Sequence, residues 1–212
     1  SLSIVESDEE RLFLIGENCD RVQCYVKKDT LYIKDVGKNK KYKNVNSRTL
    51  TLFVPEDAVW EEAEINGELG SVEIDRLDGR KVELDADLGQ ITIDTLYADK
   101  LEIDADLGGV EVSDGYAETA EFSASMGSIQ YTGMLGSDVE AEAEMGSIEM
   151  NLSQAESDFD FEINASMGSI EVNGVDNSYS YSGMDKKKKI NNDAGRKMEL
   201  ETSMGSIVIS YE

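Results

Sequence analysis

From about Ala58 onward, apolar and polar residues alternate in short runs, and the runs recur with a fixed period. Each unit carries a glycine that follows a leucine or methionine and precedes, by two positions, a valine or isoleucine. The glycines of these units are Gly70, Gly89, Gly108, Gly127, Gly146, Gly168 and Gly205. Their first four spacings are 19 residues each, and the last two are 22 and 37. A sustained period near 20 residues is typical of stacked-repeat proteins.

Alignment on the glycines places like residues in columns. The column before the glycine holds Leu69, Leu88, Leu107, Met126, Met145, Met167 and Met204. We expect it to form a continuous interior together with the valine and isoleucine column that follows the glycine. The alternation skips two residues at each glycine, which indicates a sharp corner or bulge where glycine adopts a positive φ at little cost.

Each unit therefore predicts one coil of about 19 residues, made of a strand, a corner, a second strand and a return turn. Stacked coils pair their strands in parallel, and parallel crossovers are right-handed. The sequence predicts an all-β fold, a right-handed parallel β-solenoid with an N-terminal strand and hairpin cap. Residues 1–57 are the expected cap, continuous with the solenoid at residues 58–212.

The expected cap lacks the repeat but alternates in short runs, such as Val22, Cys24 and Val26. Period-two alternation between turn residues predicts strands and hairpins. We expect the cap to cover the first coil, because a solenoid must cover its terminal coils. Residues 36–47 are expected to form a polar loop.

Two insertions interrupt the solenoid. Three extra residues lie between Met150 and Phe161, and a longer insertion near residues 174–196 contains Lys186–Lys189. The 37-residue spacing predicts one coil plus a lysine-rich loop, because no further Gly-Ser-Ile phrase occurs within it. Either this loop or another molecule should cover the last coil, so end-to-end self-association stays open.

Glutamate occupies one outward column at every coil. This column holds Glu64, Glu83, Glu102, Glu121, Glu140, Glu162 and Glu199. Equivalent residues of parallel coils lie about 4.8 Å apart, where two carboxylates in water repel by roughly 0.9 kcal/mol. Three interpretations stay open: a solvated face that prevents edge pairing, a docking face for a basic protein, and a divalent cation site. The candidate metal residues are Glu83, Asp85, Glu102 and Asp104, although calcium prefers six to eight converging oxygens.

The amino-acid composition limits which partners and which catalytic mechanisms this chain can have. The net charge of −25 makes nucleic acid and anionic lipid unfavourable partners. The chain has no histidine, which excludes Ser-His-Asp and Cys-His mechanisms. We expect no catalytic residues and no cofactor, with calcium as the alternative. Cys19 and Cys24 either form a disulfide or are free thiols, with Cys24 in the core.

No segment is long and apolar enough to span a membrane, and no signal peptide is visible at Ser1. We therefore expect no direct membrane insertion by this chain. A leader or anchor is expected to lie outside it.

The recurring x-Gly-x-Ile/Val-x-Ile/Val strands follow an alternating segment that ends in Leu-x-Val-Pro at Leu52–Pro55. Together these features resemble the bacterial toast-rack family, whose members are often labelled "putative adhesin". The resemblance covers nearly the whole chain. It implies a β-solenoid in the cell envelope, outside the cytoplasmic membrane or in the cell wall, alongside envelope-stress membrane proteins. The expected location is thus extracytoplasmic, in the envelope or secreted. The family has no established catalytic residues, so none is carried over.

The leading hypothesis is a non-catalytic envelope module, acting as a rigid scaffold or as a sensing surface for an envelope protein. The alternative is a cation-dependent adhesin that binds a surface glycan or wall polymer. A carbohydrate-active enzyme is a third hypothesis, because paired carboxylates are abundant. The coils offer few basic residues beside those carboxylates, so we rank it last.

Overall fold

The computed structural model describes residues 1–17, 19, 22–36, 49–173, 178–182 and 186–211. The N-terminal strands are β1 (Leu2–Ser7), β2 (Phe13–Glu17), β3 (Val22–Lys27), β4 (Thr30–Asp35) and β5 (Thr49–Pro55). The repeats begin with β6 (Trp60–Asn66), β7 (Ser71–Ala86), β8 (Gln90–Ala105), β9 (Gly109–Ala124), β10 (Ser128–Leu135), β11 (Val139–Ala143) and β12 (Ser147–Leu152). A 3-10 turn, η1 (Glu156–Asp158), precedes β13 (Asp160–Ala165), β14 (Ser169–Asn173), β15 (Ser178–Ser182), β16 (Lys186–Ile190), β17 (Lys197–Thr202) and β18 (Ser206–Tyr211). The expected polar loop at residues 36–47 lies, apart from Val36, outside the described residues.

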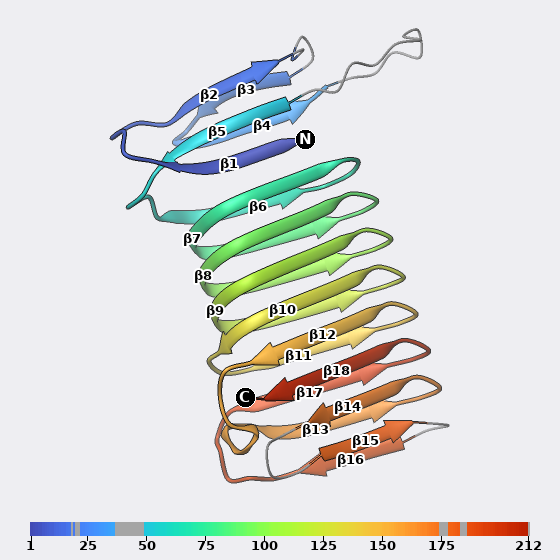
Figure 1. Cartoon of the computed structure of the whole chain (residues 1–212). Coiled ribbons are helices and arrows are strands. Elements are labelled where there is room, and N and C mark those ends of the chain that lie inside the picture. The colour runs from blue at the N-terminus through green and yellow to red at the C-terminus, as the bar shows by residue number, and fades with distance from the viewer. Residues whose placement is uncertain (18, 20–21, 37–48, 174–177, 183–185, 212) are drawn as a thin grey trace, which may run out of the picture.

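The repeats wind into a flattened coil. Strands β7, β8 and β9 each cross one face, bend, and cross the opposite face, and they pair in parallel along both faces. In Figure 1 the strand after each tight turn crosses the front from right to left, and the return crosses behind it as the chain descends. This path is right-handed and confirms the predicted parallel solenoid. The return side is a continuous bend of the strand, not a separate turn.

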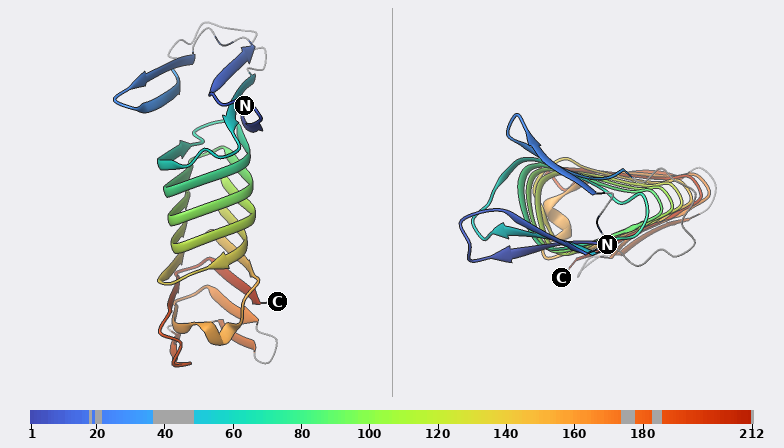
Figure 2. Two further views of the ribbon diagram at one scale, coloured as in Figure 1. Left: turned by 90° about the vertical axis from the view of Figure 1, so that its left-hand side faces the viewer. Right: turned by 90° about the horizontal axis from the view of Figure 1, so that it is seen from above.

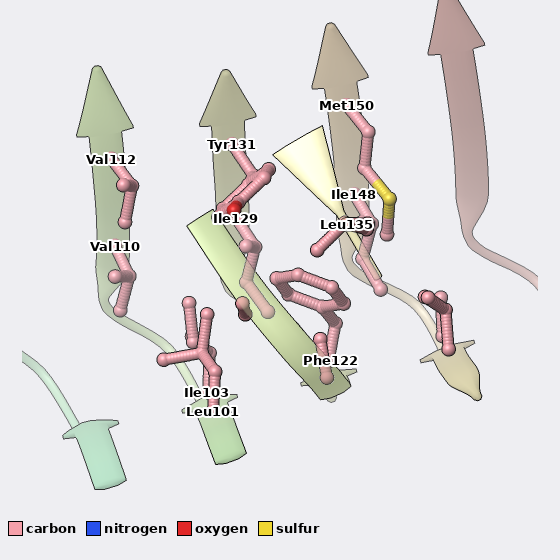
Figure 3. Close-up of a cluster of buried hydrophobic side chains, with 14 of the residues drawn as sticks. Leu101, Ile103, Val110, Val112, Phe122, Ile129, Tyr131, Leu135, Ile148 and Met150 are labelled. Carbon is pink, nitrogen blue, oxygen red and sulfur yellow. The ribbon is translucent and has the colours of Figure 1, made fainter. Parts of the chain in front are cut away.

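The interior consists of the columns on both faces that alternate inward. Ile91, Ile93 and Leu101 are completely buried, and Figure 3 shows equivalent side chains of successive coils meeting between the two faces. Tyr131 enters this core and donates a hydrogen bond through its hydroxyl to the carbonyl of Met134 at 2.9 Å. Burial raises the pKa of Tyr131 well above its usual range. The buried hydroxyl is thus neutral and paired, which makes its burial tolerable.

The leucine and methionine column does not lie in the interior, so that prediction was wrong. Leu88 is 60% exposed and Met126 is 53% exposed, at the tips of the tight turns. The narrow edge of the coil holds only small residues inside, such as the fully buried Ala86 and Ala105. The skip in alternation therefore puts two consecutive outward residues before the glycine, as Asp87 and Leu88 lie before the buried Gly89.

The glycines at these turns are needed because the backbones of neighbouring coils approach closely there, and a positive φ is not the main reason. Of the seven, only Gly70 has a positive φ, at 109°. A Cβ at Gly108 would lie 2.3 Å from the carbonyl oxygen of Gly89 in the coil above. The neighbouring coils are joined there by backbone hydrogen bonds, such as that from the Ser128 amide to the Gly108 carbonyl at 3.0 Å. The expectation of positive φ at each corner was therefore wrong, because sterics between coils set the requirement.

The last coil is not at the end of the stack. Strand β18 lies between β12 and β14, with Ile207 beside Ile148 and Ile170. On the opposite face β17 lies between β11 and β13, and Figure 1 shows this interleaving. After β12 the chain skips the level that β18 later occupies and continues through η1 to the next coil. The three extra residues lie in this longer connection. The expectation that successive units stack in sequence order is therefore wrong for the final two.

The lysine-rich insertion forms strands at the far end of the stack. Strand β15 pairs antiparallel with β14, and β16 pairs antiparallel with β13. Lys186–Lys189 are thus strand residues and not a loop, although all four remain exposed. The insertion itself lies against the terminal coil. Residues 174–177 and 183–185 of the insertion lie outside the described part.

At the other end, β1 pairs in parallel with both β7 and β5, and β2 pairs antiparallel with β5. Strands β3 and β4 form a separate hairpin that Figure 2 shows tilted away from the stack. Cys24 on β3 is exposed and both cysteines are free. The predicted burial of Cys24 is wrong because its hairpin forms its own sheet, apart from the main one.

Candidate functional site

The glutamate column forms an in-register ladder along one face. Glu64, Glu83 and Glu102 stand opposite one another on β6, β7 and β8, and Glu121 on β9 stands opposite Glu140 on β11. Glu199 then lies between Glu140 and Glu162, because β17 lies between β11 and β13. The stacking of this column was predicted, and its order at the far end was not.

Lysines pair with rungs of the ladder on either side of its middle. Lys81 pairs with Glu83 and lies 3.7 Å from Glu102, and Lys100 also pairs with Glu102. The hydrogen bond from Lys100 lowers the pKa of Glu102. The second and third rungs, Glu83 and Glu102, are therefore compensated by lysine.

At the far end, Lys189 on β16 approaches Glu162 at 2.8 Å, and Lys197 pairs with Glu199. The hydrogen bond from Lys189 lowers the pKa of Glu162. The lysine-rich insertion thus places one of its charges on the ladder.

The middle of this face carries uncompensated charge. Glu121, Glu140, Glu142 and Glu201 are all exposed. Among the described residues, none of these four forms an ion pair within 4.0 Å. Glu142 stands opposite Glu201, as Glu121 stands opposite Glu140. We call these four residues the open acidic patch.

A second acidic group lies beside the tight turns. Burial, followed by the charges of Asp87 and Asp104, raises the pKa of Asp85. Burial and the charges of Asp106 and Asp87 likewise raise the pKa of Asp104. The amide of Asn66 donates to Asp85 at 2.8 Å. The negative charges of Asp85, Asp87 and Asp104 therefore repel one another.

The residues predicted as metal candidates are not brought together as a metal centre. Glu83 and Glu102 are engaged by lysines, whereas Asp85 and Asp104 lie nearer the tight turns. Within the described ranges, no group of three or more His, Cys, Asp or Glu residues is placed to hold a metal ion. Parallel strands hold these carboxylates in a flat ladder, whereas calcium needs oxygens that converge from several directions.

A groove lies at the tight turns, and it exposes the methionine side chains that were expected to be buried. A shallow groove of about 710 Å³ runs along them and is lined by leucine, methionine, glycine and serine residues. Met126, Met145, Met167 and Met204 all line it. The two-residue skip before each glycine was the signal that could have placed these side chains outside.

The return bend exposes a smaller aromatic surface. Tyr97 and Tyr116 stand opposite each other on β8 and β9, and are 45% and 37% exposed. The guanidinium of Arg76 lies 5.1 Å from the centre of the Tyr97 ring. The hydroxyl of Tyr116 donates to Glu118 at 2.9 Å. This surface combines flat rings with charged groups.

The described part of the chain includes no helix of the length and apolar character needed to cross a membrane. Residues 16–185 match the family model described as Toastrack DUF4097. No curated protein matches the sequence.

The solved structures similar to this chain include two described as adhesion proteins. A "putative adhesin" from Bacteroides fragilis is 16% identical, with a TM-score of 0.56 over 100% of this chain and 87% of that one. A "putative cell adhesion protein" from Clostridium sporogenes is 16% identical, with a TM-score of 0.27 over 100% of this chain and 88% of that one. At such identity the first similarity shows the fold alone.

Proposed function

The chain belongs to the Toastrack family, and on that premise we propose that it is a non-catalytic module of the bacterial cell envelope that docks a basic protein. The open acidic patch is the observation that carries the proposal. In the same ladder, lysines pair with Glu83 and Glu102 on one side of the patch and with Glu162 and Glu199 on the other, whereas the patch between them has no such partner among the described residues.

The energetics favour a partner at this place. Two carboxylates about 4.8 Å apart in water repel by roughly 0.9 kcal/mol. The solenoid holds the patch in this arrangement through its backbone pairing, so the repulsion is present before any partner arrives. A lysine- or arginine-rich surface relieves it and is steered toward it by the net charge of −25, at low ionic strength most of all.

The test is carbodiimide cross-linking of carboxylates to amines in envelope fractions at increasing salt. One variant replaces Glu121, Glu140, Glu142 and Glu201 with glutamine. The matched control replaces Asp8, Glu10, Glu56 and Asp57 with their amides, which removes the same charge from exposed residues at the other end.

The wild type and the control should capture one basic protein, and the patch variant should not. Capture should also weaken as salt rises, because exposed charges are screened. Equal capture by the patch variant, or a partner with an acidic surface, would contradict the proposal.

Adhesion to a surface glycan is the second candidate function. The exposed pair of Tyr97 and Tyr116 on neighbouring strands favours it, because aromatic rings offer apolar faces beside polar groups. Titration of wall polysaccharide fragments should then shift the ring resonances of both tyrosines. Binding that survives replacement of both by alanine would remove this candidate.

A further inference from the structure

Four methionines occupy consecutive rungs at the tight turns. In spatial order the methionine ladder is Met126, Met145, Met204 and Met167. Their exposed fractions are 53%, 52%, 54% and 64%. Neither face of the solenoid buries them, so packing of the core does not explain why they are methionines.

The backbone fixes the rungs in register. The Met145 amide donates to the Ser125 carbonyl at 2.8 Å, and the Met204 amide donates to the Glu144 carbonyl at 2.6 Å. The Met167 amide donates to the Ser203 carbonyl at 2.7 Å. Each methionine is therefore one strand spacing, about 4.8 Å, from the next.

The residue type at the tight turns changes along the stack. The three turns that precede the methionine ladder carry Leu69, Leu88 and Leu107 at the same position, and these are also exposed. Leucine and methionine are similar in volume and polarity, but only methionine carries a thioether sulfur that can bind a soft metal ion. The leucine rungs thus form a natural comparison within the same molecule.

We propose that the methionine ladder binds monovalent soft metal ions, Cu(I) or Ag(I), between the sulfurs of adjacent rungs. A metal–sulfur bond is about 2.3 Å long, as in zinc–thiolate sites. An ion held in line between two sulfurs therefore needs them about 4.6 Å apart, close to the strand spacing of about 4.8 Å. Rungs that are not adjacent are two strand spacings apart, about 9.6 Å, so their side chains would have to lean across an occupied rung to share one ion.

The surroundings suit a soft ion more than a hard one. The groove around the ladder is lined by methionine, leucine, glycine and serine, and no carboxylate of the described residues lines it. Calcium and magnesium require several such oxygens. The net charge of −25 raises the local concentration of any cation.

The experiment uses the full chain with Cys19 and Cys24 replaced by alanine, because thiolates also bind these ions. Cu(I) is titrated without oxygen against a competing chelator. Ag(I) is titrated while the methyl resonances of the methionines are recorded. Signals of the four ladder methionines should shift, and those of the buried Met150 and Met198 should not.

Two double variants test the register with equal numbers of methionines. Met126→Leu with Met167→Leu leaves the adjacent Met145 and Met204, so one ion should still bind. Met126→Leu with Met204→Leu leaves Met145 and Met167 with a leucine rung between them, so binding should be lost. The leucines preserve volume, and circular dichroism checks that both variants are folded.

Equal binding by the two double variants would overturn the proposal, because it would show that register is irrelevant. Failure of the cysteine-free parent to compete with the chelator, or to show shifts with Ag(I), would overturn it as well. Retention of the envelope partner by all these variants would show that the two surfaces act independently.

Discussion

The side-chain amide of Gln154 forms two hydrogen bonds with the backbone of Leu135. It accepts from the Leu135 amide at 2.7 Å and donates to the Leu135 carbonyl at 3.0 Å. Strand β12 ends at Leu152, where the chain leaves the stack toward η1. Gln154 thus replaces the backbone partner that a continuing strand would have supplied to a buried residue.

Replacement of Gln154 by leucine should destabilise the protein by about 1–3 kcal/mol, because two buried backbone groups lose their partner. Urea denaturation followed by circular dichroism measures the change. Gln130→Leu is the control, because Gln130 is exposed, and its effect should stay within about 0.5 kcal/mol. Equal effects of the two changes would contradict this role for Gln154.

Two neighbouring glycines should respond differently to alanine. A Cβ at Gly108 would lie 2.3 Å from a backbone oxygen, whereas a Cβ at Gly109 would first meet a serine hydroxyl at 3.3 Å. Gly108→Ala should cost about 3 kcal/mol or more, because backbone cannot move aside as a side chain can. Gly109→Ala should cost less than about 1 kcal/mol. Thermal denaturation of both variants provides the comparison, and similar melting temperatures would refute it.

Two acidic residues on β8 should respond to neutralisation with opposite sign. The pKa of Asp104 is raised by burial and by neighbouring carboxylates, so its ionised form destabilises the fold at neutral pH. Asp104→Asn should therefore stabilise the protein at pH 7, by less than about 1 kcal/mol, because this carboxyl is only partly removed from water. The gain should shrink as pH falls through the folded-state pKa, because the wild-type carboxylate becomes neutral too.

Glu102, two residues earlier, has a pKa lowered by its hydrogen bond with Lys100. Its contribution to stability is present above the unfolded-state pKa and is lost as pH falls through the folded-state pKa. Glu102→Gln should therefore destabilise the protein at pH 7 and have little effect in acid. Chemical denaturation at several pH values measures the free energy of unfolding of both variants. A change of the same sign for both variants at pH 7 would contradict the opposite roles of Asp104 and Glu102.

The interleaved position of the last coil can be tested with engineered disulfides. Glu149 stands opposite Val208, and Val208 stands opposite Glu171. In a chain without Cys19 and Cys24, cysteines at 149 and 208 should oxidise to a disulfide, because their Cα atoms are about 4.8 Å apart.

Cysteines at 149 and 171 should not cross-link, because one strand separates them and disulfides do not form beyond about 7 Å between Cα atoms. Mass spectrometry after oxidation distinguishes the pairs. Efficient formation of the 149–171 disulfide alone would mean that the coils stack in sequence order.

Several features of the fold could be derived from the sequence because they depend on local alternation. Ile91 and Ile93 alternate with polar residues, and a strand sends such residues to opposite faces. The constant 19-residue spacing then requires equivalent residues to stack, which aligned the glutamates. The turn was harder to derive, because the alternation rule does not hold across it, and Leu88 was placed inside when it lies outside.

The sequence by itself determined the coil, its buried valine and isoleucine column and its acidic ladder, because each follows from a repeated local pattern. Only the tertiary structure decided which coil lies beside which. The repeat units present the same columns, so the coil ending at Tyr211 fits between two earlier coils as well as after them. Long-range pairing settled this order, together with the lysine partners of the glutamates and the sequence of rungs in the methionine ladder.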